Sequence, residues 1–148
     1  PFIGPGTYPD EDLVEIITKA SDRTRQPVAA LLKMFGRYAF PKIASRFPSF
    51  VLPYSHPKDF LKTVDQLHFV EVKKLYEDAT PPHFIYSEPS QERLVMVYRS
   101  ARRLCPLMEG LIEGVSDYFK TPVKFSQARC MHRGETECEF QLSFPPRG

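Results

Sequence analysis

The sequence predicts an α+β domain, with helices in the first half of the chain and an antiparallel sheet in the second. Apolar residues recur at helical spacing as far as Leu75, and beyond the Pro81-Pro82 pair the pattern changes to a period of two. A single further helical stripe interrupts the alternating segments. Because 148 residues suffice for one well-buried core, we expect a single domain over residues 1–148.

Two amphipathic helices are expected first. Residues 10–21 open with acidic side chains, which suit a helix N-terminus, and continue with leucine and isoleucine at helical spacing. Pro27 stands where a first-turn proline is tolerated, and a second apolar stripe runs from it toward Phe47. Pro41 lies inside that stripe and is expected to kink or split the helix, because proline lacks a backbone N–H.

A third helix is expected after Ser55-His-Pro57, which supplies a capping serine and a first-turn proline. Its apolar face carries His68 between Val64 and Val72, so we expect this imidazole to point inward. The two consecutive prolines end the helical half, because neither of them donates a backbone hydrogen bond.

The second half of the chain predicts two hairpins with one helix between them. Residues 83–88 and 93–99 alternate as adjacent strands, and residues 123–131 and 136–144 form a second pair. Between them, residues 104–119 carry a wide apolar helical face. The expected sheet is therefore four-stranded and antiparallel.

Composition excludes several classes of function. The formal net charge is only +2 and no dense Lys/Arg cluster occurs, so nucleic acid is not expected as a partner. No apolar run is long enough to span a membrane. Three cysteines, an odd number, favour a reducing cytoplasm with free or metal-bound thiolates. We find no nucleophile–base pair, phosphate loop or hydrolytic metal motif, and therefore expect no enzyme.

His68 is the first candidate functional residue. A neutral imidazole on an apolar helix face is the usual proximal ligand of haem iron. The alternative is a hydrogen-bonded histidine in the core.

A polar row, Tyr98-Arg-Ser100-Ala-Arg102, is the second candidate. Strand alternation would place Tyr98, Ser100 and Arg102 on one side, where two hydroxyls and a guanidinium suit recognition of a carboxylate. The alternative is an ordinary polar strand face that ends before a helix.

Taken together, these residues resemble a known family. His68, Ala79-Thr-Pro-Pro82, Tyr98-x-Ser-x-Arg102 and Gly110-Leu-Ile-Glu-Gly114 are similar, in order and spacing, to the H-NOX (haem nitric oxide/oxygen binding) domains related to the sensor region of soluble guanylate cyclase. The resemblance covers almost the whole chain. That family normally begins with additional short helices that complete the distal wall of the pocket, and we expect this chain to lack them.

The resemblance implies a haem b site. It implies that His68 binds the iron axially, that the polar row holds the two propionates, and that Pro82 presses on the porphyrin. The positions matching the distal pocket are Ile43, Phe47, Leu107 and Leu111. Oxygen-binding relatives have a hydrogen-bonding tyrosine where this chain has Leu107, so selectivity for nitric oxide is expected.

The implied function is that of a non-enzymatic sensor. Nitric oxide would weaken the bond between His68 and iron, and a separate histidine kinase, or a diguanylate cyclase or phosphodiesterase, would read the resulting shift. A third interpretation, a 4-vinyl-reductase-like ligand domain, rests on similarity at Cys130, Gly134 and Cys138-Glu-Phe140, and His68 and the polar row count against it.

The cysteines predict a zinc site formed by Cys105, Cys130 and Cys138. A hairpin that turns symmetrically about Gly134 sets Cys130 directly opposite Cys138, close enough for two thiolates to share one ion. His132 is the expected fourth ligand, with His56, His83 or an acidic residue as alternatives. Other interpretations are a Cys130–Cys138 disulfide or cysteines that act as small apolar residues. The alternative function that these cysteines predict is a zinc-thiolate redox sensor on the same fold, which would act independently of haem.

Overall fold

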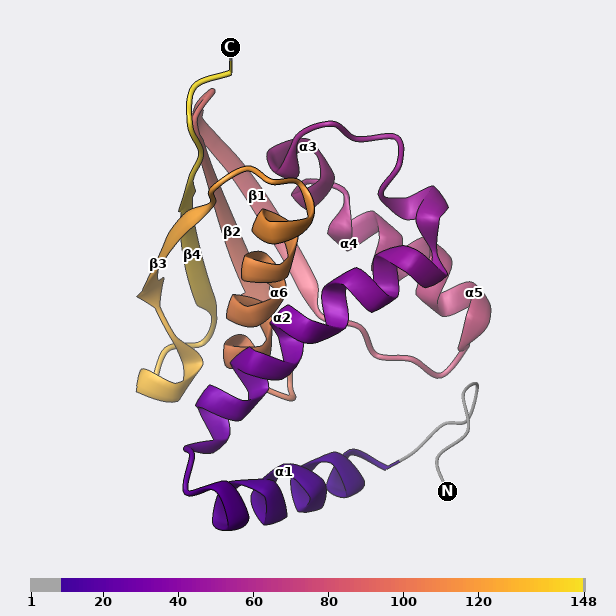
Figure 1. Ribbon diagram of the computed structural model, residues 1–148, viewed down its shortest axis with the longest axis vertical. Helices are drawn as coiled ribbons and strands as arrows, with labels where there is room; N and C mark the ends of the chain where they lie inside the picture. Colours follow the sequence, from indigo (N-terminus) through magenta and orange to yellow (C-terminus); the bar gives the residue numbers. More distant parts are fainter. Residues whose placement is uncertain (1–8, 148) are drawn as a thin grey trace.

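The computed structural model describes residues 9–147 and has a helical half packed beside a four-stranded sheet (Figure 1). The buried side chains form one hydrophobic cluster, to which α2, the region between α2 and β1, the sheet and α6 all contribute. No helix within residues 9–147 has the length and apolar character needed to cross a membrane.

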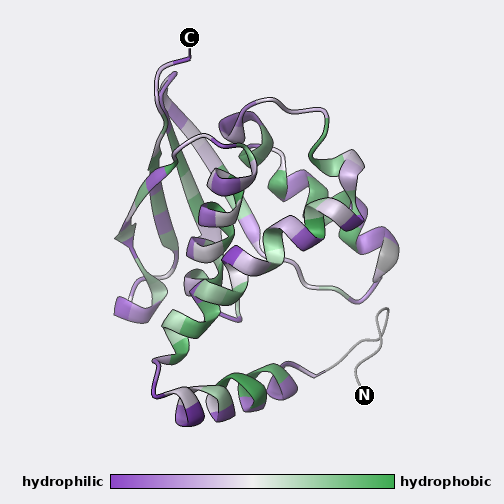
Figure 2. Ribbon diagram, in the orientation of Figure 1, coloured by the Kyte–Doolittle hydropathy of each residue, from purple (hydrophilic) through white to green (hydrophobic). Residues whose placement is uncertain are grey.

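The first two helices occur where the sequence predicts them. Helix α1 spans Asp10–Thr24 and α2 spans Val28–Arg46. Helix α2 runs through Pro41 without a break, so the expectation of a split was wrong. None of the residues of α1 is buried, although Figure 2 colours the middle of this helix hydrophobic.

The third predicted helix is instead a chain of short helical pieces. After a 3-10 turn, η1 (Pro48–Phe50), come α3 (Pro57–Leu61), α4 (Val64–Gln66), a π-helical segment η2 (Leu67–Val72) and α5 (Lys73–Leu75). The cap of α3 is His56, whose Nδ1 accepts the Lys58 N–H at 3.2 Å, and is not Ser55. Because a π-turn holds more residues than an α-turn, the predicted single stripe of period 3.6 is not continuous here.

The sheet confirms the predicted α+β class. Its strands are β1 (His83–Ser90), β2 (Arg93–Arg99), β3 (Lys124–Arg129) and β4 (Cys138–Ser143), antiparallel in the order β1-β2-β4-β3. Helix α6 (Cys105–Tyr118) is inserted between the two hairpins. The β3–β4 turn differs from a simple hairpin, because it contains a 3-10 turn, η3 (Met131–Arg133), and a register shift between Gln127 and Arg129.

Glycines allow α2 and α6 to approach until their backbones touch. A Cβ atom added at Gly110 would lie 1.9 Å from the Lys33 carbonyl oxygen, and one at Gly36 would lie 2.4 Å from the Leu107 carbonyl oxygen. Neither position has room for a side chain. The crossing fixes the helical half against the helix that covers the sheet.

Candidate functional site

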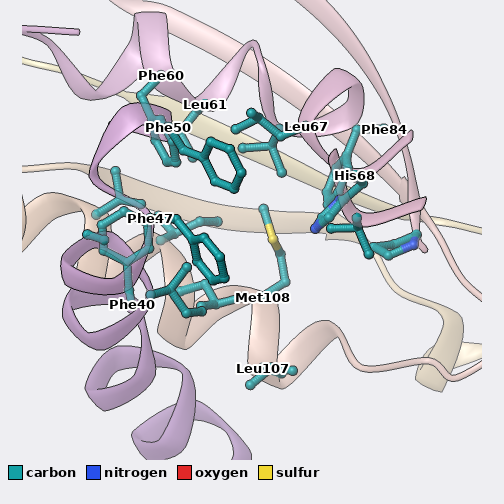
Figure 3. A pocket seen from close by; sticks show the side chains of 18 of the residues that line it. Phe40, Phe47, Phe50, Phe60, Leu61, Leu67, His68, Phe84, Leu107 and Met108 are labelled. Atoms are coloured by element: carbon teal, nitrogen blue, oxygen red, sulfur yellow. The ribbon is translucent and has the colours of Figure 1, made fainter. Parts of the chain in front are cut away.

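A largely apolar cavity of about 650 Å³ lies between the helical half and the sheet. Its walls come from α2, from the segment between η1 and α5, from the start of β1 and the end of β2, and from α6. In Figure 3, His68 stands beside Phe84, Phe40 and Phe47 lie apart from them, and Met108 projects between the two groups. This volume is typical of sites for small organic ligands and cofactors.

His68 lines this cavity from the π-helical segment η2. Its Nδ1 is buried and has no hydrogen-bond partner among the described residues. Burial lowers the pKa of His68 below the usual 6.5, and the nearby Asp65 carboxylate only partly opposes this effect. The imidazole is therefore neutral near pH 7, and one of its ring nitrogens carries a lone pair that can bind a metal ion.

The imidazole ring of His68 is held against the sheet by Phe84, whose ring stacks on it at 5.9 Å between centroids. Asp65, one helical turn earlier, accepts the Phe84 backbone N–H at 2.7 Å, and its own N–H donates to the Tyr86 hydroxyl at 3.0 Å. The segment that carries His68 is thus tied to β1 at the level of the histidine.

The three residues of the polar row all line the same cavity. Tyr98 ends the buried face of β2, but the strand stops at Arg99, so Ser100 and Arg102 are placed by a turn rather than by strand alternation. The Arg102 N–H donates to Ser100 Oγ at 3.2 Å, and the Leu104 N–H donates to the Tyr98 hydroxyl at 3.3 Å. Two hydroxyls and a guanidinium therefore do converge on one end of the cavity.

Arg102 already binds a carboxylate in this structure. Its Nε donates to Asp10 Oδ2, at the start of α1, over 2.7 Å, with the two side chains 41% and 58% exposed. A guanidinium has five N–H donors, so the same side chain can hold a second carboxylate at the cavity mouth.

All nine residues that the sequence associates with cofactor binding line the cavity. They are His68, Tyr98, Ser100, Arg102, Pro82, Leu107, Leu111, Ile43 and Phe47. Sequence reasoning missed Phe50, Phe60 and Met108, which also line it. The helical periodicity that placed Met108 on the apolar face of its helix was a usable signal, whereas Phe50 lies in a short irregular segment without one.

The three cysteines form a second cluster. The ligand atoms of Cys105, Cys130 and Cys138 all lie within 4.8 Å of one another, and all three side chains are buried. Burial, and then the neighbouring thiols, raise the pKa of Cys105 to about 12. Burial acts to raise the pKa of Cys130 too, but the His132 backbone N–H and the neighbouring thiols lower it overall, so this cysteine loses its proton before Cys105 does.

None of the histidines named as a fourth ligand belongs to the cluster. The His132 ring contacts the Arg103 carbonyl oxygen through Nε2 at 2.8 Å and is exposed. His56 caps α3, and His83 pairs with Asp65 at 3.0 Å. Within the described residues, the group of potential metal ligands consists of the three thiols only. The disulfide alternative is not realised, since all three cysteines are free.

Comparison with known proteins identifies one family and a group of similar solved structures. A family model described as Haem-NO-binding matches residues 1–127. The chain is similar to the structure of an H-NOX protein from S. oneidensis in the Fe(II)NO state, at 25% identity and a TM-score of 0.92, covering 99% of this chain and 81% of that one. A search of curated proteins finds no match.

Two further solved structures are similar to this chain. An Fe(II) unliganded H-NOX protein from K. algicida has 24% identity and a TM-score of 0.89, covering 99% of this chain and 79% of that one. A mutant of the T. tengcongensis H-NOX has 25% identity and a TM-score of 0.88, with coverages of 99% and 80%.

Proposed function

This chain belongs to the Haem-NO-binding (H-NOX) family, and from that premise we propose that it is a non-enzymatic, haem-based nitric oxide sensor module of the cytoplasm. The observation that carries the proposal is His68. The neutral ring lines the cavity and makes no hydrogen bond through its buried Nδ1, so a ring lone pair is free to bind a metal ion there.

The remaining residues of the cavity fit haem b. The macrocycle requires a flat apolar slot, which the phenylalanines, Met108, Leu107 and Leu111 supply. The two propionates require donors at one end of that slot, where Tyr98, Ser100 and Arg102 converge. Pro82 lies in the cavity wall, where it can press on the porphyrin.

We further propose how the signal leaves the site. Bound haem would supply the gas-binding chemistry, and His68 would hold its iron through a bond that nitric oxide would weaken. Because Asp65 and Phe84 tie the His68 segment to β1, a change at this histidine is transmitted to the sheet. A separate histidine kinase, or a diguanylate cyclase or phosphodiesterase, reads the change.

Absorption spectroscopy of the purified protein tests the proposal. We expect a Soret band after expression with haem supply, and a shift of that band when nitric oxide is added to the ferrous protein. Air should give no stable oxygen complex, because bound oxygen needs a hydrogen-bond donor beside it, and Leu107, at the position matching the tyrosine of oxygen-binding relatives, offers none. A protein that binds no haem under reducing conditions would exclude the sensor function.

The polar row predicts an order of importance for haem retention. Arg102→Ala removes a charge-assisted bond worth about 1.5–3 kcal/mol, and Ser100→Ala removes a neutral one worth about 0.5–1.5 kcal/mol, both reduced by solvent. We therefore expect haem to transfer to an apo-globin acceptor faster from Arg102→Ala than from Ser100→Ala. Equal transfer rates would contradict the assignment of Arg102 to a propionate.

The thiol cluster supports a second candidate function, a zinc-thiolate redox sensor that acts independently of haem. Three buried thiols within 4.8 Å suit a zinc ion, with His132 as the proposed fourth ligand after a movement of its exposed ring. A two-electron oxidant such as a peroxide, itself reduced to water or an alcohol, would convert two of the thiols to a disulfide and release the ion.

Metal analysis of protein purified under reducing conditions tests this function. We expect about one zinc per chain, following the single-ion stoichiometry of such sites, and loss of the zinc in a Cys130→Ser/Cys138→Ser variant. The site is absent if the parent protein holds only traces of zinc or if the variant retains it.

A further inference from the structure

The haem cavity and the thiol cluster share one short segment of chain. Strand β2 ends at Arg99 and α6 begins at Cys105, so the residues between them, Ser100–Leu104, form a connecting turn. Ser100 and Arg102 in this turn line the cavity, and Cys105, the next residue after it, belongs to the thiol cluster.

On the cavity side, one hydrogen bond closes the connecting turn and another holds it to the sheet. The Arg103 N–H donates to the Ser100 carbonyl oxygen at 3.2 Å, and the Leu104 N–H donates to the Tyr98 hydroxyl at 3.3 Å. Arg103 has a φ of 50°, a left-handed conformation that is unfavourable for a residue with a side chain. The turn therefore depends on its contacts to keep this shape.

On the cluster side, the same turn is contacted by residues around the thiols. The Arg103 carbonyl oxygen lies 2.8 Å from His132 Nε2 and 3.9 Å from Cys105 Sγ. Tyr98, which receives the Leu104 N–H, is the direct cross-strand neighbour of Cys138. The Arg103–Leu104 end of the turn thus contacts Cys105 directly and reaches Cys138 through Tyr98.

We propose that a soft divalent metal ion in the thiol cluster controls how firmly the cavity retains haem, a proposal that rests on both functions above. Without an ion, only weak contacts join the thiols, such as the 3.8 Å separation of Cys105 Sγ and Cys130 Sγ. An ion shared by all three joins the start of α6 to η3 and to β4. That link holds the connecting turn, and with it Ser100 and Arg102, in the carboxylate-binding arrangement.

Haem transfer measured with and without the metal tests this coupling. Reduced, haem-loaded protein is stripped of zinc with a chelator, and one portion is reloaded with Zn²⁺. Transfer to excess apo-globin is then followed at the Soret band. We expect the ion to slow haem loss about fivefold or more, the lower end of typical couplings between sites. Stoichiometric zinc with an unchanged transfer rate overturns the coupling while leaving both separate functions in place.

Two tyrosine variants locate the path of the coupling. Tyr98→Phe keeps all three thiols and loses the hydroxyl that receives the Leu104 N–H, so haem loss should become faster overall and the zinc effect should shrink. Tyr86→Phe is the matched control, because its hydroxyl receives the Asp65 N–H instead, and we expect the full zinc effect there. An undiminished zinc effect in Tyr98→Phe, or equal losses in both variants, contradicts the proposed path.

A failure of either underlying function gives a different result. If the reduced protein takes up no Zn²⁺, the thiol cluster is not a metal site and the coupling is overturned with it. If the protein takes up Zn²⁺ but never binds haem, the sensor function fails, and the coupling, which acts on bound haem, is overturned with it. Only a protein that binds both, with a slower haem loss in the zinc form, supports the coupling.

Discussion

Replacement of Gly110 by alanine is expected to lower the free energy of unfolding by more than about 2 kcal/mol. The new methyl group would lie 1.9 Å from the Lys33 carbonyl oxygen and 2.9 Å from the Arg37 backbone nitrogen. Both neighbours are backbone atoms of α2, so no side-chain rotation relieves the clash and the two helices must separate. Overpacking commonly costs about 1–3 kcal/mol, and backbone contacts place this case at the upper end.

Helix propensity acts in the opposite direction, which makes the test sharp. Alanine is favoured over glycine inside a helix by about 1 kcal/mol, so a variant without a clash would be more stable than the parent. Urea unfolding of Gly110→Ala should be compared with Glu109→Ala, an adjacent change whose surface ion pair with Lys33 contributes little. A Gly110→Ala variant as stable as the parent would mean that the helices do not cross this closely.

His68→Ala is expected to remove haem binding almost completely. We expect the affinity to fall by more than about 100-fold, because losing even a partner of a metal ligand costs about 10–100-fold. The apo fold should persist, since the substitution removes a buried polar atom that has no partner among the described residues. Absorption spectra before and after adding imidazole measure the effect, and free imidazole should restore part of the Soret band by occupying the space of the lost ring.

His83→Ala provides the matched histidine control. His83 is exposed, pairs with Asp65 and lies against Phe69, and does not line the cavity. Its replacement should therefore leave the Soret band in place. An intact band in His68→Ala, or its loss in His83→Ala, would show that the iron ligand has been misassigned.

Much of the fold could be predicted because local pattern and tertiary structure agree there. Alternation placed β1 and β2 nearly at their observed bounds, and the wide apolar stripe placed α6 within about one residue, close to the usual uncertainty of helix ends. Around His68 the local sequence pattern and the observed structure disagree. A π-turn has no signature of period 3.6, so the broken chain of helices was interpreted as one. The split expected at Pro41 does not occur, and contact between Phe40 and α6 at Gly114 supports α2 there.

The site was predicted in its residue types more than in its arrangement. His68 and the polar row were found as chemically distinctive residues, and the structure brings all of them to one cavity. The anchoring role of Asp65 was invisible, because its partner Phe84 is 19 positions away and contributes only a backbone N–H. The close contact between the helices was equally hidden, since a glycine in a sequence does not reveal which backbone it faces.

The register shift in the β3–β4 hairpin has a consequence for folding. On the outer side of the shift, Phe125 pairs with the buried Leu142. On the turn side, Arg129 pairs with Glu139, and the Met131 N–H donates to Cys138 Sγ at 3.3 Å. A regular ladder that grew outward from the Gly134 turn in the inner register would carry Phe125 to the solvent face, because a slip of one residue reverses every side chain. The extra residue of the bulge therefore lets the turn end and the outer end of one hairpin keep different registers, so that Phe125 stays on the core face.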